Sequence, residues 1–259
     1  MQKALFICRK MCYNSVIKRQ CAYFAAVLYY LEATVMICVI GDTHGDYSRF
    51  SQKKIKALKK DDFLVICGDF GFVWDGSDRE KAILKKIGAK RFTTLFLTGS
   101  HDNYDLLEQY PEEDFLGGRA RNISGRLYML SSGGIFDLNG HKAYVFGGGQ
   151  AADIDVRIEN STWWEQELPD EAQLESGRKR LEAADGKVDY IFTHEPPGSL
   201  AEFLQTGKQA VLPMSRLNIY FDEMKGEIAF KMWFFGKLHK NKLIPPKYAA
   251  VFDEPFVIE

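Results

Sequence analysis

Histidine and aspartate side chains follow most of the apolar runs in this sequence, at positions where they could share a metal ion. Four of the five histidines and two aspartates lie just after such a run: His44, His101, His194, His239, Asp42 and Asp69. A mixed set of carboxylates and imidazoles suits a divalent ion such as Mn²⁺, Fe²⁺ or Zn²⁺. Each residue alone has a plainer interpretation, since Gly-Asp is a common turn and a single histidine is more often a satisfied core residue. Their shared position makes a metal site the stronger prediction.

Short apolar runs alternate with stretches of helical periodicity, which predicts an α/β fold. The runs typical of buried strands are MICVIGD (36–42), FLVICGD (63–69), TLFLTGS (94–100), KAYVFGGG (142–149), VDYIFTH (188–194) and MWFFGKLH (232–239). Helical spacing occurs in SRFSQKKIKALKK (48–60), DREKAILKKIG (78–88) and DEAQLESGRKRLEAA (170–184). The turn Asn139-Gly140 indicates a hairpin, so antiparallel strands should join the parallel ones. Such sheets place ligand sites outside the carboxyl ends of their strands, where the histidines and aspartates should converge.

The composition indicates a folded protein without a strong overall charge. Hydrophobic residues make up 46% of the 259 residues, and no linker divides residues 36–259, which we interpret as one domain. A net charge of −1 and a pI of about 6.5 give no overall basic field for nucleic acid or an anionic membrane. Five cysteines without a C-x-x-C pair argue against a disulfide framework and a zinc ribbon, so a reducing cytoplasm fits best.

Residues 1–35 differ from the rest of the chain. They carry five basic side chains against one acidic side chain, and they hold three of the five cysteines. The apolar stretch AYFAAVLYYL (22–31) is too short to span a bilayer and lacks a convincing cleavage site, which disfavours an anchor or a signal peptide. We expect a poorly integrated leader, or translation from an upstream start, ahead of a domain that begins at Met36.

Five short motifs resemble, in order, those of the calcineurin-like metallophosphoesterases: Asp42-Thr-His44, Gly68-Asp69, Gly99-Ser-His101-Asp102, Thr193-His194 and Gly236-Lys-Leu-His239. The resemblance covers about residues 36–245, and the segment GGGQAADIDVR…WW (147–164) is similar to a bacterial and phage branch of the family. It implies an α/β fold of four layers, an αββα sandwich of two mixed β-sheets flanked by helices. It also implies a dinuclear metal centre at the strand ends.

The resemblance assigns roles to individual residues. Asp42, His44 and His239 resemble the usual ligands of the first metal. Asp69 resembles the carboxylate that bridges both ions. His194 resembles a ligand of the second metal. His101 resembles the histidine that protonates the leaving group. The family activity that follows is metal-dependent hydrolysis of phosphoric esters.

Two positions depart from the family pattern, and both fall on the second metal. Ser100 stands where the family usually has asparagine, and Lys237 stands where it has the first histidine of GHxH. A protonated lysine has no lone pair to donate, and beside a divalent ion it would cost roughly 4 kcal/mol per unit charge pair at about 4 Å. We expect one ion rather than two, with Lys237 as a built-in cation and Ser100 as a substrate contact. The alternative is drift in an inactive copy, with His239 a surface histidine of a basic loop.

The residues predict a phosphatase or phosphodiesterase that uses metal-activated water, with manganese among the expected ions and a phosphorylated small molecule as substrate. The rival hypothesis is a catalytically weak module of the same fold that binds a phosphate-bearing ligand or a partner. A membrane partner is not expected. A nucleic-acid phosphodiesterase is less favoured, because its basic edge would consist of residues that more often form a solvated face: Lys237, Lys240, Lys242 and Lys247.

Three further features of the sequence each have a functional and a structural interpretation. Arg157 could clamp phosphate oxygens with its forked guanidinium, but a surface or salt-bridged arginine is at least as good an interpretation. Trp163 and Trp164 could line a substrate pocket or close a core. The run Gly147–Gly149 could direct backbone N–H groups at phosphate, although a glycine run alone is weak evidence.

Overall fold

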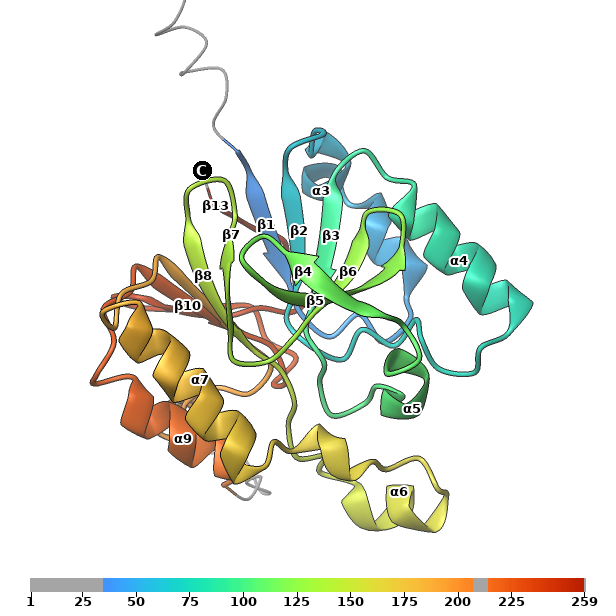
Figure 1. The fold of residues 1–259 in the computed structure, drawn as a ribbon. Coiled ribbons are helices and arrows are strands. Elements are labelled where there is room, and N and C mark those ends of the chain that lie inside the picture. Colours follow the sequence, from blue (N-terminus) through green and yellow to red (C-terminus); the bar gives the residue numbers. More distant parts are fainter. Residues whose placement is uncertain (1–34, 207–213, 259) are drawn as a thin grey trace, which may run out of the picture. The chain divides into compact units, whose positions relative to one another are not determined.

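The computed structural model describes residues 35–206 and 214–258, and Met36–Ile258 form one compact unit (Figure 1). The predicted leader, residues 1–35, lies outside the described residues apart from Val35, so its independence from the domain stays a prediction. Among the described residues, no helix combines the length and the apolar character needed to cross a membrane.

The first sheet has seven strands. They are β1 (Ile37–Ile40), β2 (Phe63–Ile66), β3 (Thr93–Phe96), β4 (Glu112–Phe115), β5 (Gly118–Ser124), β6 (Leu127–Leu130) and β13 (Phe256–Ile258). Their order across the sheet is β13-β1-β2-β3-β6-β5-β4. The four middle strands from β1 to β6 run parallel, whereas β13, β5 and β4 pair antiparallel with their neighbours. β1 and β2 are buried at every residue, as expected for parallel strands covered on both faces.

The second sheet has six strands. They are β7 (Gly134–Asp137), β8 (Lys142–Phe146), β9 (Tyr190–Thr193), β10 (Met232–Phe235), β11 (Lys242–Ile244) and β12 (Tyr248–Ala250), in the order β11-β12-β10-β9-β8-β7. β8, β9, β10 and β12 run parallel, and β7 and β11 are antiparallel edges. The predicted turn closes the β7–β8 hairpin, with Asn139 at a φ of 55° and Gly140 at 89°. Both sheets are therefore mixed, as predicted.

The helices connect these strands. They are α3 (Lys53–Ala57), α4 (Asp78–Gly88), α5 (Tyr104–Leu107), α6 (Ile154–Glu159), α7 (Glu171–Ala183), α8 (Gly198–Gln205) and α9 (Arg216–Met224). Two 3₁₀ helices, η1 (Tyr47–Ser51) and η2 (Glu165–Glu167), complete the set within the described residues.

Two of the three predicted helices have their expected bounds, and the third is broken. α4 occupies residues 78–88, and α7 lies within residues 170–184, where Asp170 caps its first turn. The helix predicted over residues 48–60 is instead η1 followed by the short α3. Gln52 separates them because its backbone is extended, with φ −64° and ψ 144°.

Apolar side chains on both faces of the sheets build four layers. Outside the first sheet, Ile40 of β1 packs in one core cluster with Ile55 of α3 and Leu84 of α4. Outside the second sheet, another cluster joins strand residues to α7 and α9: Tyr144, Ile191, Trp233, Leu174, Leu181 and Phe221. Between the sheets, the ring of Phe234 in β10 lies 5.1 Å from that of Phe256 in β13. The αββα sandwich predicted from the sequence is confirmed (Figure 1).

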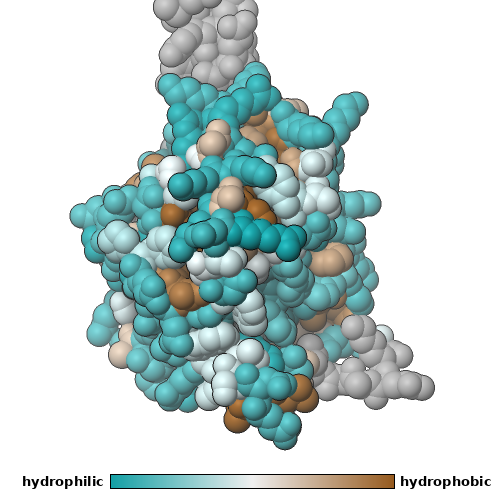
Figure 2. Space-filling view, turned by 90° about the vertical axis from the view of Figure 1, so that its right-hand side faces the viewer, coloured by the Kyte–Doolittle hydropathy of each residue, from teal (hydrophilic) through white to brown (hydrophobic). Residues whose placement is uncertain are grey.

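The surface on the α4 side is largely hydrophilic, and Figure 2 shows small, separate hydrophobic patches there. α4 accounts for part of this surface, because it buries Leu84 and Ile87 toward the sheet and leaves most of its charged residues exposed. Such a face is typical of an amphipathic helix on the outside of a layered domain.

Candidate metal centre

The carboxyl ends of parallel strands from both sheets carry the predicted metal ligands. Asp42 and His44 follow β1 and Asp69 follows β2 in the first sheet, whereas His194 follows β9 and His239 follows β10 in the second. These side chains form two groups whose potential ligand atoms lie within 4.8 Å of one another: Asp42, His44 and His239, and Asp42, Asp69 and His194. Loops far apart in the sequence thus meet at one site, as expected for strand ends of an α/β fold.

The backbone is strained at this site. Five non-glycine residues of the site have a positive φ, between 44° and 67°: Asp42, His44, Asp69, Lys237 and His239. Such conformations cost of the order of 1–3 kcal/mol each and persist where surrounding contacts over-determine them. They turn the side chains sharply out of the strand direction and into a common space. Backbone strain of this kind is common at functional sites, and here it gathers at the predicted metal ligands.

Two glycines let these side chains approach the backbone closely. A Cβ at Gly68 would overlap the ring of His194, and a Cβ at Gly236 would lie 2.7 Å from Asp42 Oδ2. Real Cβ atoms essentially never come that close to another heavy atom. The glycines of the GD and GKLH motifs are therefore required by packing of the ligands.

The first group brings two imidazoles to the carboxylate of Asp42, and Asp69 lies next to His44. The Nε2 atoms of His44 and His239 are 3.0 Å apart, and His239 Nε2 lies 3.7 Å from Asp42 Oδ1. His44 Nε2 lies 3.8 Å from Asp69 Oδ2. Burial lowers the pKa of both histidines, and the neighbouring His44 lowers the pKa of His239 further. Neutral imidazoles are the form that binds metal ions, so this donor set fits a divalent cation.

The two buried aspartates lie close enough to affect each other's charge. Burial and the charge of Asp69 raise the pKa of Asp42. Burial also raises the pKa of Asp69, but His194, His101 and Lys237 outweigh it and the net shift is downward. Two carboxylates with little access to water favour a bound cation, which relieves their mutual repulsion. The charge balance of the site is therefore consistent with a metal ion.

His194 is oriented by a backbone carbonyl. The side chain is fully buried, and its Nδ1 lies 3.1 Å from the carbonyl oxygen of Cys67, to which it can donate. Nε2 then faces Asp69 Oδ1 and Ser100 Oγ, each at 3.4 Å. Burial lowers the pKa of His194 to about 4, so the ring is neutral. Metal-binding histidines usually donate one ring N–H to a partner such as a backbone carbonyl, and the other ring nitrogen then binds the metal.

Lys237 points into the site and not toward solvent. Its Nζ donates to Ser100 Oγ at 2.7 Å and to the carbonyl oxygen of Gln150 at 2.7 Å. Its backbone N–H donates to both carboxylate oxygens of Asp42 at 3.0 Å. The two residues that depart from the family pattern, Lys237 and Ser100, are thus in direct contact. Their contact lies beside His194, on the side of the second group.

His101 lies between two carboxylates. Its Nδ1 is 3.1 Å from Asp69 Oδ2, and its Nε2 is 3.2 Å from Asp153 Oδ1. Its backbone N–H also donates to Asp69 Oδ1 at 2.8 Å. The hydrogen bond to Asp69 raises the pKa of His101 above its ordinary value. A partly exposed histidine whose protonated form is favoured can act as a proton donor.

Arg157 is engaged by the protein itself. The side chain is buried, and its two terminal nitrogens donate to the two carboxylate oxygens of Glu167 at 2.9 and 2.5 Å. The same nitrogens donate to the carbonyl oxygens of Ser100 and Thr162. Of the two interpretations left open by the sequence, the geometry favours the salt-bridged arginine over the phosphate clamp. Its effect on the site is indirect, because it holds the backbone of Ser100.

Three acidic residues near the site had no role assigned from the sequence, although Asp102 is part of one of the motifs. Asp153 contacts His101 from the start of α6. Glu195 is buried and accepts hydrogen bonds from the backbone N–H of Gln150 and the hydroxyl of Ser215. Asp102 ties two ligand loops together by accepting the N–H groups of Gly71 and Gly99 at 3.0 and 2.8 Å. Glu195 follows His194 directly and Asp102 follows His101 directly, which was the signal available in the sequence.

The aromatic pair and the basic edge have local partners. The ring of Trp164 lies 5.9 Å from that of Trp74 in an edge-to-face contact. Lys240 donates to the carbonyl oxygen of Leu204, and two further lysines lie over aromatic rings: Lys242 over Phe203 and Lys247 over Phe230. Each of these three lysines thus has a local partner within the protein.

Comparison with known protein families supports the same assignment as the geometry. The model of the family described as calcineurin-like phosphoesterase matches residues 35–234, which include every strand from β1 to β9 and end before Lys237 and His239. A comparison with curated proteins gave no match. The match covers well over half of the chain, and the strand-end site holds two groups of side chains that could bind metal ions. The chain belongs to the calcineurin-like phosphoesterase family.

Proposed function

We propose that this protein hydrolyses phosphoric esters with one divalent ion, and that Lys237 supplies a fixed positive charge in place of a second ion. The ion would be held by Asp42, His44 and His239, whose donor atoms lie within 4.8 Å of one another, and by Asp69, whose Oδ2 lies 3.8 Å from His44 Nε2. The family supports the hydrolase activity. The observation that carries the one-ion proposal is the contact of Lys237 Nζ with Ser100 Oγ at 2.7 Å, beside His194.

The charges of the site suit a phosphoryl group. When bound, the ion supplies Lewis-acid stabilisation of phosphoryl oxygens and lowers the pKa of water. The ammonium group of Lys237 has three N–H donors, and Ser100 and Gln150 take two of them. The third remains for a phosphoryl oxygen, whose charge grows in the transition state. Lys237 thus replaces part of what a second ion would contribute.

His101 would give its proton to the leaving oxygen. The hydrogen bond to Asp69 raises the pKa of the ring and so favours its protonated form, and Asp69 orients the ring through Nδ1. Nε2 faces Asp153, whose side chain is half exposed and can give way to a substrate. The proton then lies at the rim of the site, where a leaving group departs to solvent.

We further propose a phosphorylated small molecule as the substrate and a reducing cytoplasm as the compartment. Lys240, Lys242 and Lys247 each contact the protein itself, and this supports a small substrate over nucleic acid. Cys38 and Cys67 are buried free thiols, in keeping with a reducing compartment.

Elemental analysis of purified protein, together with a panel of phosphomonoesters and phosphodiesters in added Mn²⁺, tests the proposal. About one ion per chain and turnover of at least one ester class are expected. Two ions at native occupancy would contradict the role given to Lys237. Saturable phosphate binding with no turnover of any ester would instead favour the catalytically weak binding module.

A further inference from the structure

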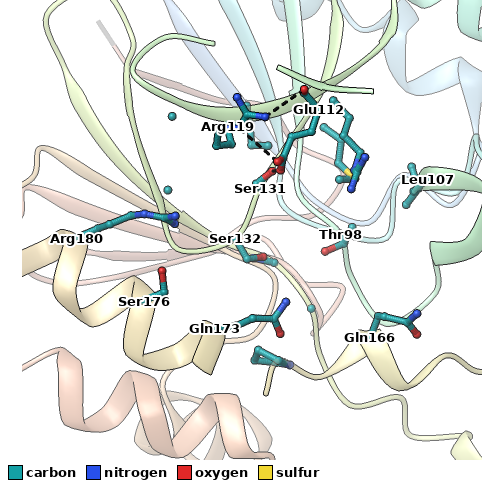
Figure 3. Close-up of a pocket in the computed structure, with 18 of the residues that line it drawn as sticks. Thr98, Leu107, Glu112, Arg119, Ser131, Ser132, Gln166, Gln173, Ser176 and Arg180 are labelled. Atoms are coloured by element: carbon teal, nitrogen blue, oxygen red, sulfur yellow. Dashed lines mark hydrogen bonds and ion pairs between the residues drawn. The ribbon is translucent and has the colours of Figure 1, made fainter. Parts of the chain in front are cut away.

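A wide cleft lies apart from the metal ligands, between the β4–β6 edge of the first sheet and α7 (Figure 3). Its volume is about 810 Å³, within the range of about 300–1,000 Å³ of small-molecule sites. No predicted metal ligand lines it. Its size and its mixed polar and apolar lining are those of a binding site for an organic molecule.

One wall of the cleft is a polar stripe of α7. Gln173, Ser176 and Arg180 are three and four residues apart, so they share one face of the helix, and Figure 3 shows them along the cleft. Arg180 donates to the carbonyl oxygen of Gly133 at 3.2 Å and has no carboxylate partner among the described residues. On the same helix, Arg178 pairs with two glutamates instead. Arg180 therefore brings an uncompensated positive charge to the cleft.

The other two members of the stripe add hydrogen-bond donors. Gln173 is fixed by its Oε1, which accepts the backbone N–H of Asp170 at 2.9 Å, so its amide nitrogen remains as a donor. The hydroxyl of Ser176 has no hydrogen-bond partner in the described part of the chain. A guanidinium, a hydroxyl and an amide on one helix face are suited to the several oxygens of a phosphate group.

On the opposite wall, Arg119 is held in ion pairs with two carboxylates. Arg119 pairs with Glu112 at 3.3 Å and with Asp114 at 2.8 Å, and Ser131 donates to Glu112 at 2.7 Å (Figure 3). Leu107 and Met129 add apolar side chains to the lining. This wall offers contact surface to the body of a ligand, and α7 offers the charge.

The floor of the cleft is the reverse side of two loops of the metal centre. The backbone N–H of Gly148 donates to the carbonyl oxygen of Thr98 at 2.8 Å, and both residues line the cleft. Two residues further along each loop are Gln150 and Ser100, the acceptors of Lys237. The cleft and the metal centre are thus separate sites on the two sides of one backbone layer.

We propose that this cleft binds a small organic phosphate monoester, with its phosphate on Arg180 and Ser176 and its organic part against the β4–β6 wall. A molecule of mononucleotide size matches the volume. This site is independent of the proposed catalytic function, because none of its residues is a metal ligand.

Titration calorimetry of the full chain, stripped of metal with EDTA, tests the proposal with AMP as the probe and adenosine as the phosphate-free control. AMP should bind saturably, and adenosine should bind at least about tenfold more weakly. Arg180→Gln should weaken AMP binding about tenfold or more, the usual effect of losing a charge-assisted hydrogen bond, and Ser176→Ala should weaken it by a smaller factor. Arg178→Gln, an arginine on the same helix that faces two glutamates, should leave binding unchanged.

Lys237→Ala separates this cleft from the metal centre. AMP binding that survives Lys237→Ala and is lost in Arg180→Gln supports the cleft, provided that Arg180→Gln unfolds at the wild-type temperature. Binding that is lost in Lys237→Ala and kept in Arg180→Gln would assign AMP to the metal centre and overturn the proposal. Absence of saturable AMP binding to the wild type would overturn it as well.

Discussion

Lys237 contacts the metal centre through its backbone and its side chain, and the two contacts are separable. The N–H donates to Asp42, and Nζ donates to Ser100 and Gln150. The backbone of Lys237 has a φ of 67°. A different side chain at this position can therefore keep the contact with Asp42 while it changes the charge beside His194.

We predict that Lys237→His combined with Ser100→Asn rebuilds a second metal position. The double variant restores an imidazole and an amide oxygen beside Asp69 and His194, and it removes the ammonium group. Elemental analysis should give about two Mn²⁺ ions per chain, against about one in the wild type. Each single variant should stay near one ion, because either the ligand deficit or the repulsion remains. Lys240→His is the matched control, since that lysine contacts Leu204 outside the site.

The ligand and proton-donor roles predict different losses. Asp42→Ala or His239→Ala should lower the ion content from about one per chain to near zero, since each removes one of four ligands. His101→Ala should keep the ion and slow hydrolysis about 10²–10⁴-fold, most for esters with poor leaving groups. This dependence is measured from the hydrolysis rates of a series of aryl esters whose leaving groups differ in pKa. An equal loss for every leaving group would exclude proton donation by His101.

At the scale of elements, α6 and η2 support the site through one buried ion pair. The side chains of Arg157 and Glu167 are 5% and 1% exposed, and their contact joins α6 to η2 and to the Ser100 loop. Removal of one partner leaves the other charge buried and unpaired. Loss of a buried partner typically costs about 3–5 kcal/mol.

We predict that Arg157→Met lowers the free energy of unfolding by about 3–5 kcal/mol, and that Arg157→Met with Glu167→Met recovers a large part of the loss. Denaturant titration of each variant measures this. Arg178→Met, which breaks exposed pairs with Glu223 and Glu227, should cost about 0–1 kcal/mol. A weaker affinity for substrate without loss of stability would restore the phosphate-clamp interpretation of Arg157.

The sequence predicted the buried parallel strands and the two longest helices, α4 and α7, and it missed the shorter helices α5, α6, α8 and α9. β1, β2, β3, β8, β9 and β10 lie within or overlap the predicted runs, because buried parallel strands are continuously apolar. α5 and α6 have four and six residues, too few for a helical period to appear. Asp153 was missed because its contact with His101 joins residues 52 positions apart, which only tertiary structure brings together.

At the scale of the whole molecule, the metal centre depends on both sheets at once. The first sheet provides Asp42 and Asp69, and the second provides His194, Lys237 and His239. The contact of Lys237 with Asp42 crosses from one sheet to the other. The site therefore forms only when the sandwich Met36–Ile258 is assembled, and any segment that is needed for this assembly is needed for metal binding.

We predict that residues 1–35 are dispensable for this assembly. The backbone of Met36 is already fixed to the fold, since its N–H donates to Asp62 Oδ1 at 2.9 Å and its carbonyl accepts the N–H of Phe63 at 3.0 Å. A chain that starts at Met36 would place its new amino group beside the Asp62 carboxylate, which favours the same contact. Thermal unfolding and metal content should match those of the full chain. Loss of folded protein on truncation would instead indicate that the apolar stretch 22–31 packs on the domain and completes its core.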